Sequence, residues 1–372
     1  MLVKSSADTP PTARSAAVHQ RLVAALSARH PLLAGEGFEH HLFRVGDTVL
    51  KVYRWFRAAG LSLEAELELR EEQRVLHQVY APRLAASVVA LDVRGDPCPP
   101  RSAQACCYAL SMRLADEIPA DVWRHLEASA WSRRAGAALA DCHRCAPRVV
   151  VASPDPAGVL EQLLVDAARL HDGERRRFPV ARPLGDLVRA RAGRLARRTR
   201  AAARRQVVAS HGDMNTGNLV VCAGDVQFID PGLAMPAGVG LDVPVPFDAG
   251  WDVALLGQSI ALFGGRQAAR WFVGAYAGAA GIGRNLLGED LLYWRALALV
   301  LTLGATMRYS TEILDPGRPF APRQRPGFRL ETYVRWLVSS LHAVLEASDT
   351  DATANWTGWP ADPPTGARYM EE

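Results

Sequence analysis

The segment 207–232, VVASHGDMNTGNLVVCAGDVQFIDPG, constrains the fold of this chain more than any other part of it. Two short apolar runs, LVV and VQFI, flank a turn-like Ala-Gly-Asp, which is the pattern of a tight β-hairpin. Asn218 precedes the first run and Asp230 follows the second, so the hairpin would carry both side chains to one end. Because Asp213 stands five residues before Asn218, we predict that the three polar side chains share one site.

These three side chains have the chemistry that phosphoryl transfer requires. A carboxylate beside an attacking hydroxyl orients and deprotonates it, while an amide oxygen and a second carboxylate hold Mg²⁺ against nucleotide phosphates. Asp213 follows His211-Gly212 with the spacing of an H-x-D-x-x-x-x-N catalytic loop, in which we interpret His211 as a scaffold residue. The alternative is that these residues only cap a turn, which is an ordinary role for such residue types.

A second region, 32–53, predicts a hairpin that covers a nucleotide. It contains Gly35 and Gly37, a strand-like HLFRV, a Gly-Asp turn and a second strand-like run, TVLKVY. Lys51 alternates with apolar neighbours in the second run, so its ammonium would leave the opposite face and reach phosphate oxygens. The alternative interpretation of Lys51 is a solvated strand lysine.

The segment 62–80 predicts an acidic helix. Its apolar residues are spaced for one buried stripe, formed by Leu69, Leu76 and Val79. Glu72 falls on this stripe, where a carboxylate is costly without a cation, so we expect Glu72 to pair with Lys51. Glu68, one turn earlier, is the alternative partner.

Two strand-like runs follow this helix, AASVVALDV and ACCYALSMRL, before Pro119 begins a helical region. Ser111, Met112 and Arg113 end the second run. We expect these three residues to connect two lobes, where their backbone groups would meet a nucleotide base.

Together, these motifs resemble those of the aminoglycoside phosphotransferase and choline kinase-like enzymes, which are small-molecule relatives of the protein kinases. GEGFEHHLFRV resembles the nucleotide loop of this family, REEQRVL its lysine-partner helix and HGDMNTGN its catalytic loop, within a resemblance that spans about residues 30–310. The resemblance implies a two-lobed α+β fold of the protein-kinase type. The small N-lobe would hold an antiparallel sheet and one long helix, and the larger C-lobe would be mostly helical.

The resemblance also implies a reaction and its site. It implies Mg²⁺-dependent transfer of the terminal phosphoryl group of ATP or GTP to a hydroxyl of a small molecule, with Asp213 as base and Asn218 and Asp230 as metal ligands. One departure is Pro231, which stands where many members carry an aromatic residue. Farther on, FDAGWDVALL resembles the structural aspartate of the family, so Asp248 or Asp252 would cap a helix or brace the catalytic loop.

The expected domain organisation has four parts. These are a flexible N-terminus at 1–14, a nucleotide-binding lobe at 15–113, a catalytic and acceptor-binding lobe at 114–347 with helices near 251–264, 267–279, 289–312 and 329–347, and a polar tail at 348–372. The N-terminus has no secretory pattern and no apolar run reaches membrane-spanning length, so we expect no membrane association and a cytoplasmic location. The sequence leaves open whether the protein is a monomer or a homodimer.

Two further features have chemically ordinary explanations. Cys142-His143-Arg144-Cys145 lacks a second ligand pair for zinc, so we interpret it as a packing segment. The segment 189–205 carries eight arginines and no acid. It is either a solvated helix or an anion-binding face. Because the net charge is only +4, we favour the solvated helix and do not expect nucleic-acid binding.

The acceptor stays open at the level of sequence. A polycationic antibiotic would need a carboxylate cluster, for which the candidates are Asp155, Glu161, Asp166 and Asp186. The arginine-rich segment favours a neutral or anionic acceptor instead. The alternatives to a resistance kinase are therefore a metabolite kinase for an amino sugar, amino alcohol or similar compound, and a nucleotide-binding regulator without transfer activity.

Overall fold

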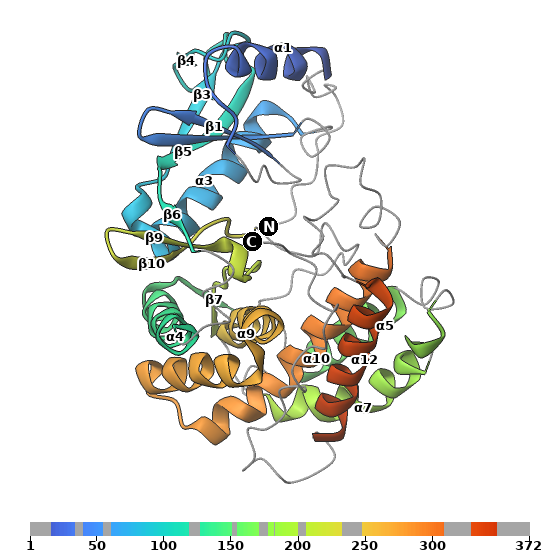
Figure 1. The fold of residues 1–372 in the computed structure, drawn as a ribbon. Coiled ribbons are helices and arrows are strands. Elements are labelled where there is room, and N and C mark those ends of the chain that lie inside the picture. The colour runs from blue at the N-terminus through green and yellow to red at the C-terminus, as the bar shows by residue number, and fades with distance from the viewer. Residues whose placement is uncertain are drawn as a thin grey trace. The chain divides into compact units, whose positions relative to one another are not determined.

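The structure of this chain is a computed structural model (Figure 1). It describes residues 16–33, 40–54, 61–118, 127–150, 155–170, 178–181, 183–199, 206–232, 248–308 and 329–347. The predictions for Gly35, Gly37, the N-terminal lead and the polar tail lie outside these residues.

The chain divides into two compact units, residues 1–116 and 117–372, three residues later than the boundary expected at 113. The first unit contains α1 (Ala16–Ser27), β1 (His40–Val45), β2 (Thr48–Tyr53), α3 (Leu63–Tyr80), the 3₁₀ turn η1 (Pro82–Leu84), β3 (Ser87–Leu91), β4 (Pro97–Cys98) and β5 (Cys107–Arg113). The two-residue strand β6 (Asp116–Glu117) spans the boundary.

The second unit is mostly helical. It contains α4 (Ala128–Cys145), β7 (Arg148–Val150), α5 (Pro156–Leu170), η3 (Pro179–Ala181), α7 (Leu184–Arg198), β8 (Gln206–Val208), η5 (Thr216–Asn218), β9 (Leu219–Cys222), β10 (Asp225–Phe228), α9 (Ala249–Ala280), α10 (Arg284–Arg308) and α12 (Leu330–Ala347). None of the helices that the structure describes is long and apolar enough to cross a bilayer.

The first unit is built on a five-stranded antiparallel sheet in the order β1-β2-β5-β3-β4. The predicted hairpin joins β1 and β2 at a two-residue turn that begins with Gly46, whose φ of 61° is in the left-handed region where glycine is favoured. One sheet face packs against Leu22 and Leu26 of α1, and the other against Leu67 of α3. The sheet is therefore covered by one helix on each face.

The buried face of α3 differs from the predicted one. Ser62 caps the helix, its hydroxyl accepting a hydrogen bond from the Ala65 amide at 3.1 Å. The buried side chains are Glu66, Leu67, Arg70, Gln73, His77 and Tyr80, whereas the predicted stripe of Leu69, Leu76 and Val79 is only half-buried. Glu72 is exposed, so its placement on the buried stripe is wrong. The apolar periodicity did not predict the buried face of α3, because the face that packs on the sheet is largely polar.

Close helix packing organises the second unit. α4 packs along α9 at Gly136, where a Cβ would lie 2.3 Å from the Phe272 carbonyl oxygen. α9 contains a kink at Gly265 (φ 79°, ψ 175°), which divides it into the two helices predicted at 251–264 and 267–279 (Figure 1). The other two predicted helices correspond to α10 and α12. α7 ends at Arg198, so only the first part of the arginine-rich segment is seen as helix.

Candidate active site

The hairpin predicted at 219–229 is present and carries Asn218 and Asp230 at one end. β9 and β10 pair in register from Asp225 opposite Cys222 to Phe228 opposite Leu219. The turn between them places Ala223 and Gly224 at φ 52° and 82°, which is the geometry of a tight two-residue connection. Beyond the register, the Ile229 amide donates to the Asn218 carbonyl at 2.8 Å, which extends the pairing to the two predicted ligands.

Asn218 also contacts the predicted catalytic residue. Its amide nitrogen donates to the Asp213 carbonyl oxygen at 2.7 Å and lies 3.2 Å from Oδ2 of the Asp213 carboxylate. Asn215 begins the short η5 turn, and its side chain accepts from the Gly217 amide at 2.9 Å. Both contacts of Asn218 use the nitrogen, so its amide oxygen is the atom turned to other partners.

The segment after β10 is held against the catalytic loop by a hydrogen bond and by close backbone packing. His211 Nε2 lies 2.9 Å from the Ile229 carbonyl oxygen. A Cβ on Gly212, whose φ is 88°, would lie 2.7 Å from the Gly232 carbonyl, and a Cβ on Gly232 would lie 3.2 Å from Cβ of Asp213. The two glycines permit this approach, which places Asp213 against the segment that begins with Asp230.

A fully buried carboxylate, Asp252 of α9, holds the backbone of the catalytic loop. One of its oxygens accepts from the His211 amide at 2.7 Å, and the other accepts from the Gly212 amide at 2.9 Å. The Trp251 indole donates to the Gly212 carbonyl at 3.1 Å. Asp248 caps α9, accepting from the Ala249 amide at 2.8 Å. Of the two roles left open for these aspartates, Asp248 has the cap and Asp252 has the brace.

The network extends to a histidine that the sequence did not single out. His143 Nε2 lies 3.0 Å from Oδ2 of Asp252, and His143 Nδ1 lies 2.8 Å from the Tyr276 hydroxyl. His143 stands between Cys142 and Cys145 in the C-x-x-C segment, and both cysteines are free thiols. The histidine of this segment orients Asp252. Only the tertiary contact of α4 with α9 reveals this.

Burial and nearby charges shift the pKa values of Asp213 and His211 in the catalytic loop. Desolvation by the surrounding protein raises the pKa of the Asp213 carboxyl, and this outweighs the lowering effects of His211 and of the Asn218 hydrogen bond. Desolvation lowers the pKa of the fully buried His211, against the opposite effect of Asp252. The Asp213 side chain is nevertheless exposed at its edge, so solvent or a substrate can reach it. His211 is a buried scaffold residue, in agreement with the sequence interpretation.

Lys51 of the first unit lies on the sheet face covered by α3. It pairs with Leu110 across the sheet, and directly opposite residues of a sheet point to the same face. The lysine is only 3% exposed, and its Nζ lies 5.1 Å from the centre of the Tyr53 ring. Arg70 of α3 stacks on the same ring, with Cζ 3.3 Å from the centre. The prediction that Lys51 points away from its apolar neighbours is confirmed, and it is not a solvated lysine.

The acids of α3 are placed differently from the prediction. Both Glu72 and its alternative Glu68 are exposed, whereas Glu66 is 2% exposed and faces the sheet. The Tyr108 amide of β5 lies 3.5 Å from Oε2 of Glu66. Glu66 is therefore a buried α3 carboxylate on the face that carries Lys51.

Ser111, Met112 and Arg113 are strand residues rather than a connection. They end β5 and pair with Leu50, Val49 and Thr48 of β2, and the following Leu114 amide donates to the Asp47 carbonyl at 2.9 Å. Strand pairing thus continues to the end of the run. The prediction that 111–113 form the connection is therefore wrong, because these residues lie within β5, whereas the expected contact of their backbone groups with a nucleotide base stays a prediction.

Three of the four acids suggested for the acceptor side have partners within or next to their own helices, and the fourth, Glu161, has its carboxylate against Gly193 of α7. Asp155 accepts from the Gly158 amide at 2.9 Å at the start of α5. Asp166 accepts from Gln162 at 2.7 Å in the same helix, and Asp186 forms an ion pair with Arg189 in α7. These groups serve helix caps and surface pairs, which are weak and common.

Comparison with known proteins identifies the family. The model of the phosphotransferase enzyme family matches residues 15–281, which is more than half of the chain. A choline/ethanolamine kinase family protein from Mesorhizobium loti superposes with a TM-score of 0.51 at 16% identity, covering 91% of this chain and 97% of that one. A thermostable mutant of the aminoglycoside phosphotransferase APH(4)-Ia, in its apo form, superposes with a TM-score of 0.51 at 13% identity, covering 88% and 98%.

A search of curated proteins found no match. The structural similarities, at these low identities, establish the fold, and they confirm the predicted α+β kinase-like architecture. The family match confirms the resemblance seen in the sequence motifs. The chain belongs to the phosphotransferase enzyme family.

Proposed function

We propose that this protein is a Mg²⁺-dependent kinase that transfers the terminal phosphoryl group of ATP or GTP to a hydroxyl group of a small molecule. The observation that carries the proposal is the convergence of Asp213, Asn218 and Asp230 at one end of the β9–β10 hairpin. Local pairing accounts for the hairpin, but the glycine contact between the catalytic loop and the segment after β10 is what brings all three side chains together.

The residues present suit a magnesium ion. Mg²⁺ prefers oxygen ligands, and it usually takes one or two protein carboxylates with phosphates and water completing the shell. Asp230 supplies a carboxylate, and Asn218 supplies an amide oxygen whose partner nitrogen is fixed by Asp213. When bound there, the ion would neutralise the charge that develops on the transferred phosphoryl oxygens.

Asp213 is the group that acts on the acceptor in this proposal. Its carboxylate accepts the hydroxyl proton as the oxygen attacks phosphorus, while Asn218 keeps the carboxylate oriented. The raised pKa of Asp213 makes it a stronger base than an ordinary surface aspartate. The buried brace from Asp252 fixes the backbone on which Asp213 stands, so that the base is held before substrate arrives.

Lys51 holds the inner phosphates of the nucleotide in this proposal. A buried ammonium needs anionic partners, which the phosphates and a carboxylate of α3 would supply. We replace Glu72 with Glu66 as the proposed carboxylate, since Glu66 is buried on the face of the sheet that carries Lys51. Glu72 and Glu68 are exposed and have no part in this arrangement.

The acceptor proposed is a hydroxyl compound of low charge. The carboxylates of Asp155, Asp166 and Asp186 already have partners in a cap and in surface pairs, which argues against a dedicated carboxylate cluster for a polycation. This favours an amino sugar, an amino alcohol or a similar metabolite over a highly charged aminoglycoside. An uncharged or singly charged antibiotic fits the same description.

The decisive experiment is phosphoryl transfer from labelled ATP or GTP to a panel of amino sugars, amino alcohols, aminoglycosides and macrolides. Asp213→Ala and Asp230→Ala should each abolish Mg²⁺-dependent transfer. Asp225→Ala, which removes an exposed carboxylate at the start of the same β10 strand, is the matched control and should keep full activity. Nucleotide binding without transfer to any acceptor or to water would instead indicate a regulator.

A further inference from the structure

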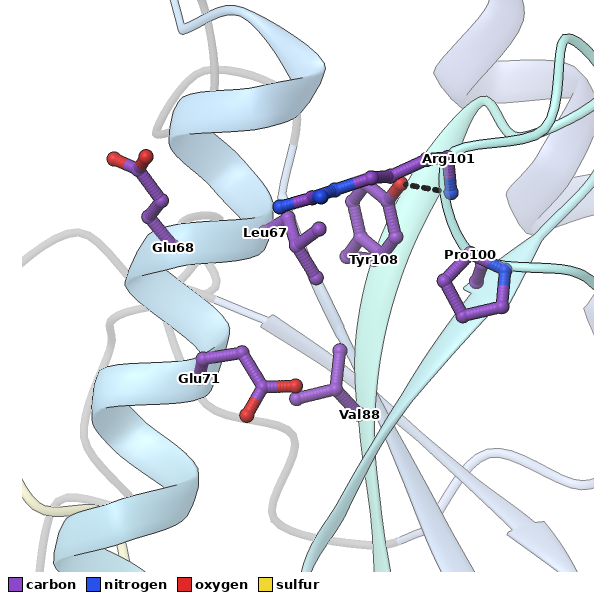
Figure 2. A pocket seen from close by; sticks show the side chains of 8 residues that line it. Leu67, Glu68, Glu71, Val88, Pro100, Arg101 and Tyr108 are labelled. Atoms are coloured by element: carbon purple, nitrogen blue, oxygen red, sulfur yellow. Dashed lines mark hydrogen bonds between the residues drawn. The ribbon is translucent and has the colours of Figure 1, made fainter.

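A cavity in the first unit lies on the α3 side of the sheet. Its volume is about 400 Å³, and it is lined by α3, β3, the start of β5 and the turn that precedes β5 (Figure 2). This volume is within the range of small-molecule binding sites, roughly 300–1,000 Å³. The proposed catalytic residues, including Lys51, are not among its lining residues.

The cavity has an apolar floor and a charged rim. Leu67, Val88 and Tyr108 supply the floor. Glu71 projects from α3 toward Val88, while Arg101 extends from its turn across Tyr108 toward α3 (Figure 2). Glu68, the other acid of the lining, points away from this surface, so one carboxylate and one guanidinium approach the apolar floor from two different elements (Figure 2).

Glu71 and Arg101 are each held in place by a hydrogen bond that leaves a carboxylate oxygen or the guanidinium group available to a ligand. Arg74 Nε lies 2.6 Å from Oε2 of Glu71, so Oε1 is the oxygen available to a ligand. The Arg101 backbone amide donates to the buried Tyr108 hydroxyl at 3.0 Å, which fixes the turn that presents this arginine. The Arg101 guanidinium forms no ion pair with any residue that the structure describes.

We propose that this cavity binds a small zwitterion with an apolar body, which is the chemistry of an aromatic or branched-chain amino acid. The ammonium group pairs with Glu71, the carboxylate forms a bidentate pair with Arg101, and the apolar side chain packs on Leu67 and Tyr108. A ligand with only one charge would remove water from either the guanidinium or the carboxylate without pairing with it, and this desolvation weakens binding.

A ligand bound in this cavity would also restrain the motion of α3. The Tyr108 ring forms part of the cavity floor, while the Tyr108 backbone amide lies 3.5 Å from the buried Glu66 carboxylate of α3. Leu67, next to Glu66 in the helix, touches the cavity as well. A ligand that bridges α3 and the Arg101 turn therefore restrains the helix that carries Glu66.

The test uses three probes with the same phenyl body: L-phenylalanine, phenethylamine and 3-phenylpropionate. Their binding to the purified full chain is measured by calorimetry up to about 10 mM, with hydrogen exchange of α3 as a second readout. Phenylalanine should bind at least about 10-fold more tightly than either single-charge probe, and it should slow exchange in α3. No nucleotide or acceptor is needed, so this result does not depend on the proposed kinase activity.

Charge variants locate the site. Glu71→Gln should weaken binding of phenylalanine and phenethylamine but not of 3-phenylpropionate. Arg101→Gln should weaken binding of phenylalanine and 3-phenylpropionate but not of phenethylamine. Glu64→Gln, at an exposed acid of the same helix outside the cavity, is the control and should leave all three affinities unchanged. Absence of saturable binding by phenylalanine, or affinities that neither variant changes in well-folded protein, would overturn the proposal.

Discussion

Replacement of Asp252 tests whether one buried carboxylate holds the catalytic loop. Its two oxygens accept hydrogen bonds from the His211 and Gly212 amides, and Oδ2 also contacts His143 Nε2, all within 3.0 Å. Asparagine has the same shape but only one acceptor oxygen, so at least one buried amide of the loop would face an NH₂ group. Each buried donor left without a partner costs about 1–3 kcal/mol.

We therefore expect Asp252→Asn to lower the free energy of unfolding by about 1–3 kcal/mol, and Asp252→Ala, which removes both acceptors, by about 2–6 kcal/mol. Urea denaturation followed by circular dichroism measures this change. The kcat for phosphoryl transfer should fall by at least about 10-fold in Asp252→Asn at temperatures where the variant is folded, because the loop that carries Asp213 is released.

Asp248→Asn is the matched control in the same helix. Asp248 accepts a hydrogen bond from the Ala249 amide as the N-cap of α9, and asparagine is an equally good N-cap. This variant should lose no more than a few tenths of a kcal/mol. If Asp252→Asn were as stable and as active as Asp248→Asn, the brace assigned to Asp252 would be refuted.

Three further predictions follow from the same contacts. Gly212→Ala should lower the free energy of unfolding, measured by urea denaturation, by about 3 kcal/mol or more, because a φ of 88° is combined with a Cβ 2.7 Å from a carbonyl oxygen. Gly224→Ala, at a φ of 82° with open space around the added Cβ, should lower it by only about 1–2 kcal/mol. Glu66→Gln should raise KM for the nucleotide or lower kcat, while Glu72→Gln should do neither; equal effects would contradict the assignment. Desolvation raises the pKa of the Cys142 thiol to about 12, so the thiol stays protonated at pH 8 and should react with iodoacetamide only after unfolding, as peptide mass spectrometry would show.

The catalytic hairpin could be predicted from the sequence because it is a local structure. The strands, the turn and the flanking Asn218 and Asp230 lie within a short segment, and the period of two fixes which residues meet. The same holds for the β1–β2 hairpin and for Lys51, whose face follows from alternation in β2. In each case the prediction needed no knowledge of distant contacts.

The orientation of α3 could not be predicted in this way. Apolar residues usually mark the buried face of a helix, but here Glu66, Arg70 and Gln73 occupy that face. They have partners on that face: Arg70 donates to Gln73 and stacks on Tyr53, and the Tyr108 amide lies 3.5 Å from the Glu66 carboxylate. Glu72 and Glu68, the carboxylates expected to pair with Lys51, lie on the exposed side of α3 instead, and the pairing of Lys51 with Glu66 is a proposal.

The support of the catalytic loop also depends on contacts that the sequence does not record. His143 reaches Asp252 from a helix more than a hundred residues earlier in the chain. No spacing rule links the two residues, and the flanking cysteines drew attention to metal chemistry instead. The near contact of Gly212 with Gly232 is another case, because it becomes visible only when the two loops lie side by side.

The most direct test of the central claim is nucleotide-dependent binding of Mn²⁺, a spectroscopic substitute for Mg²⁺, measured by electron paramagnetic resonance in the presence of a non-hydrolysable ATP analogue. If Asn218 and Asp230 hold the ion, wild-type protein and Asp225→Asn should bind it saturably and with equal affinity. Asp230→Asn and Asn218→Ala should each lose at least about 10-fold in affinity. Wild-type affinity in both of these variants would contradict the proposed metal site.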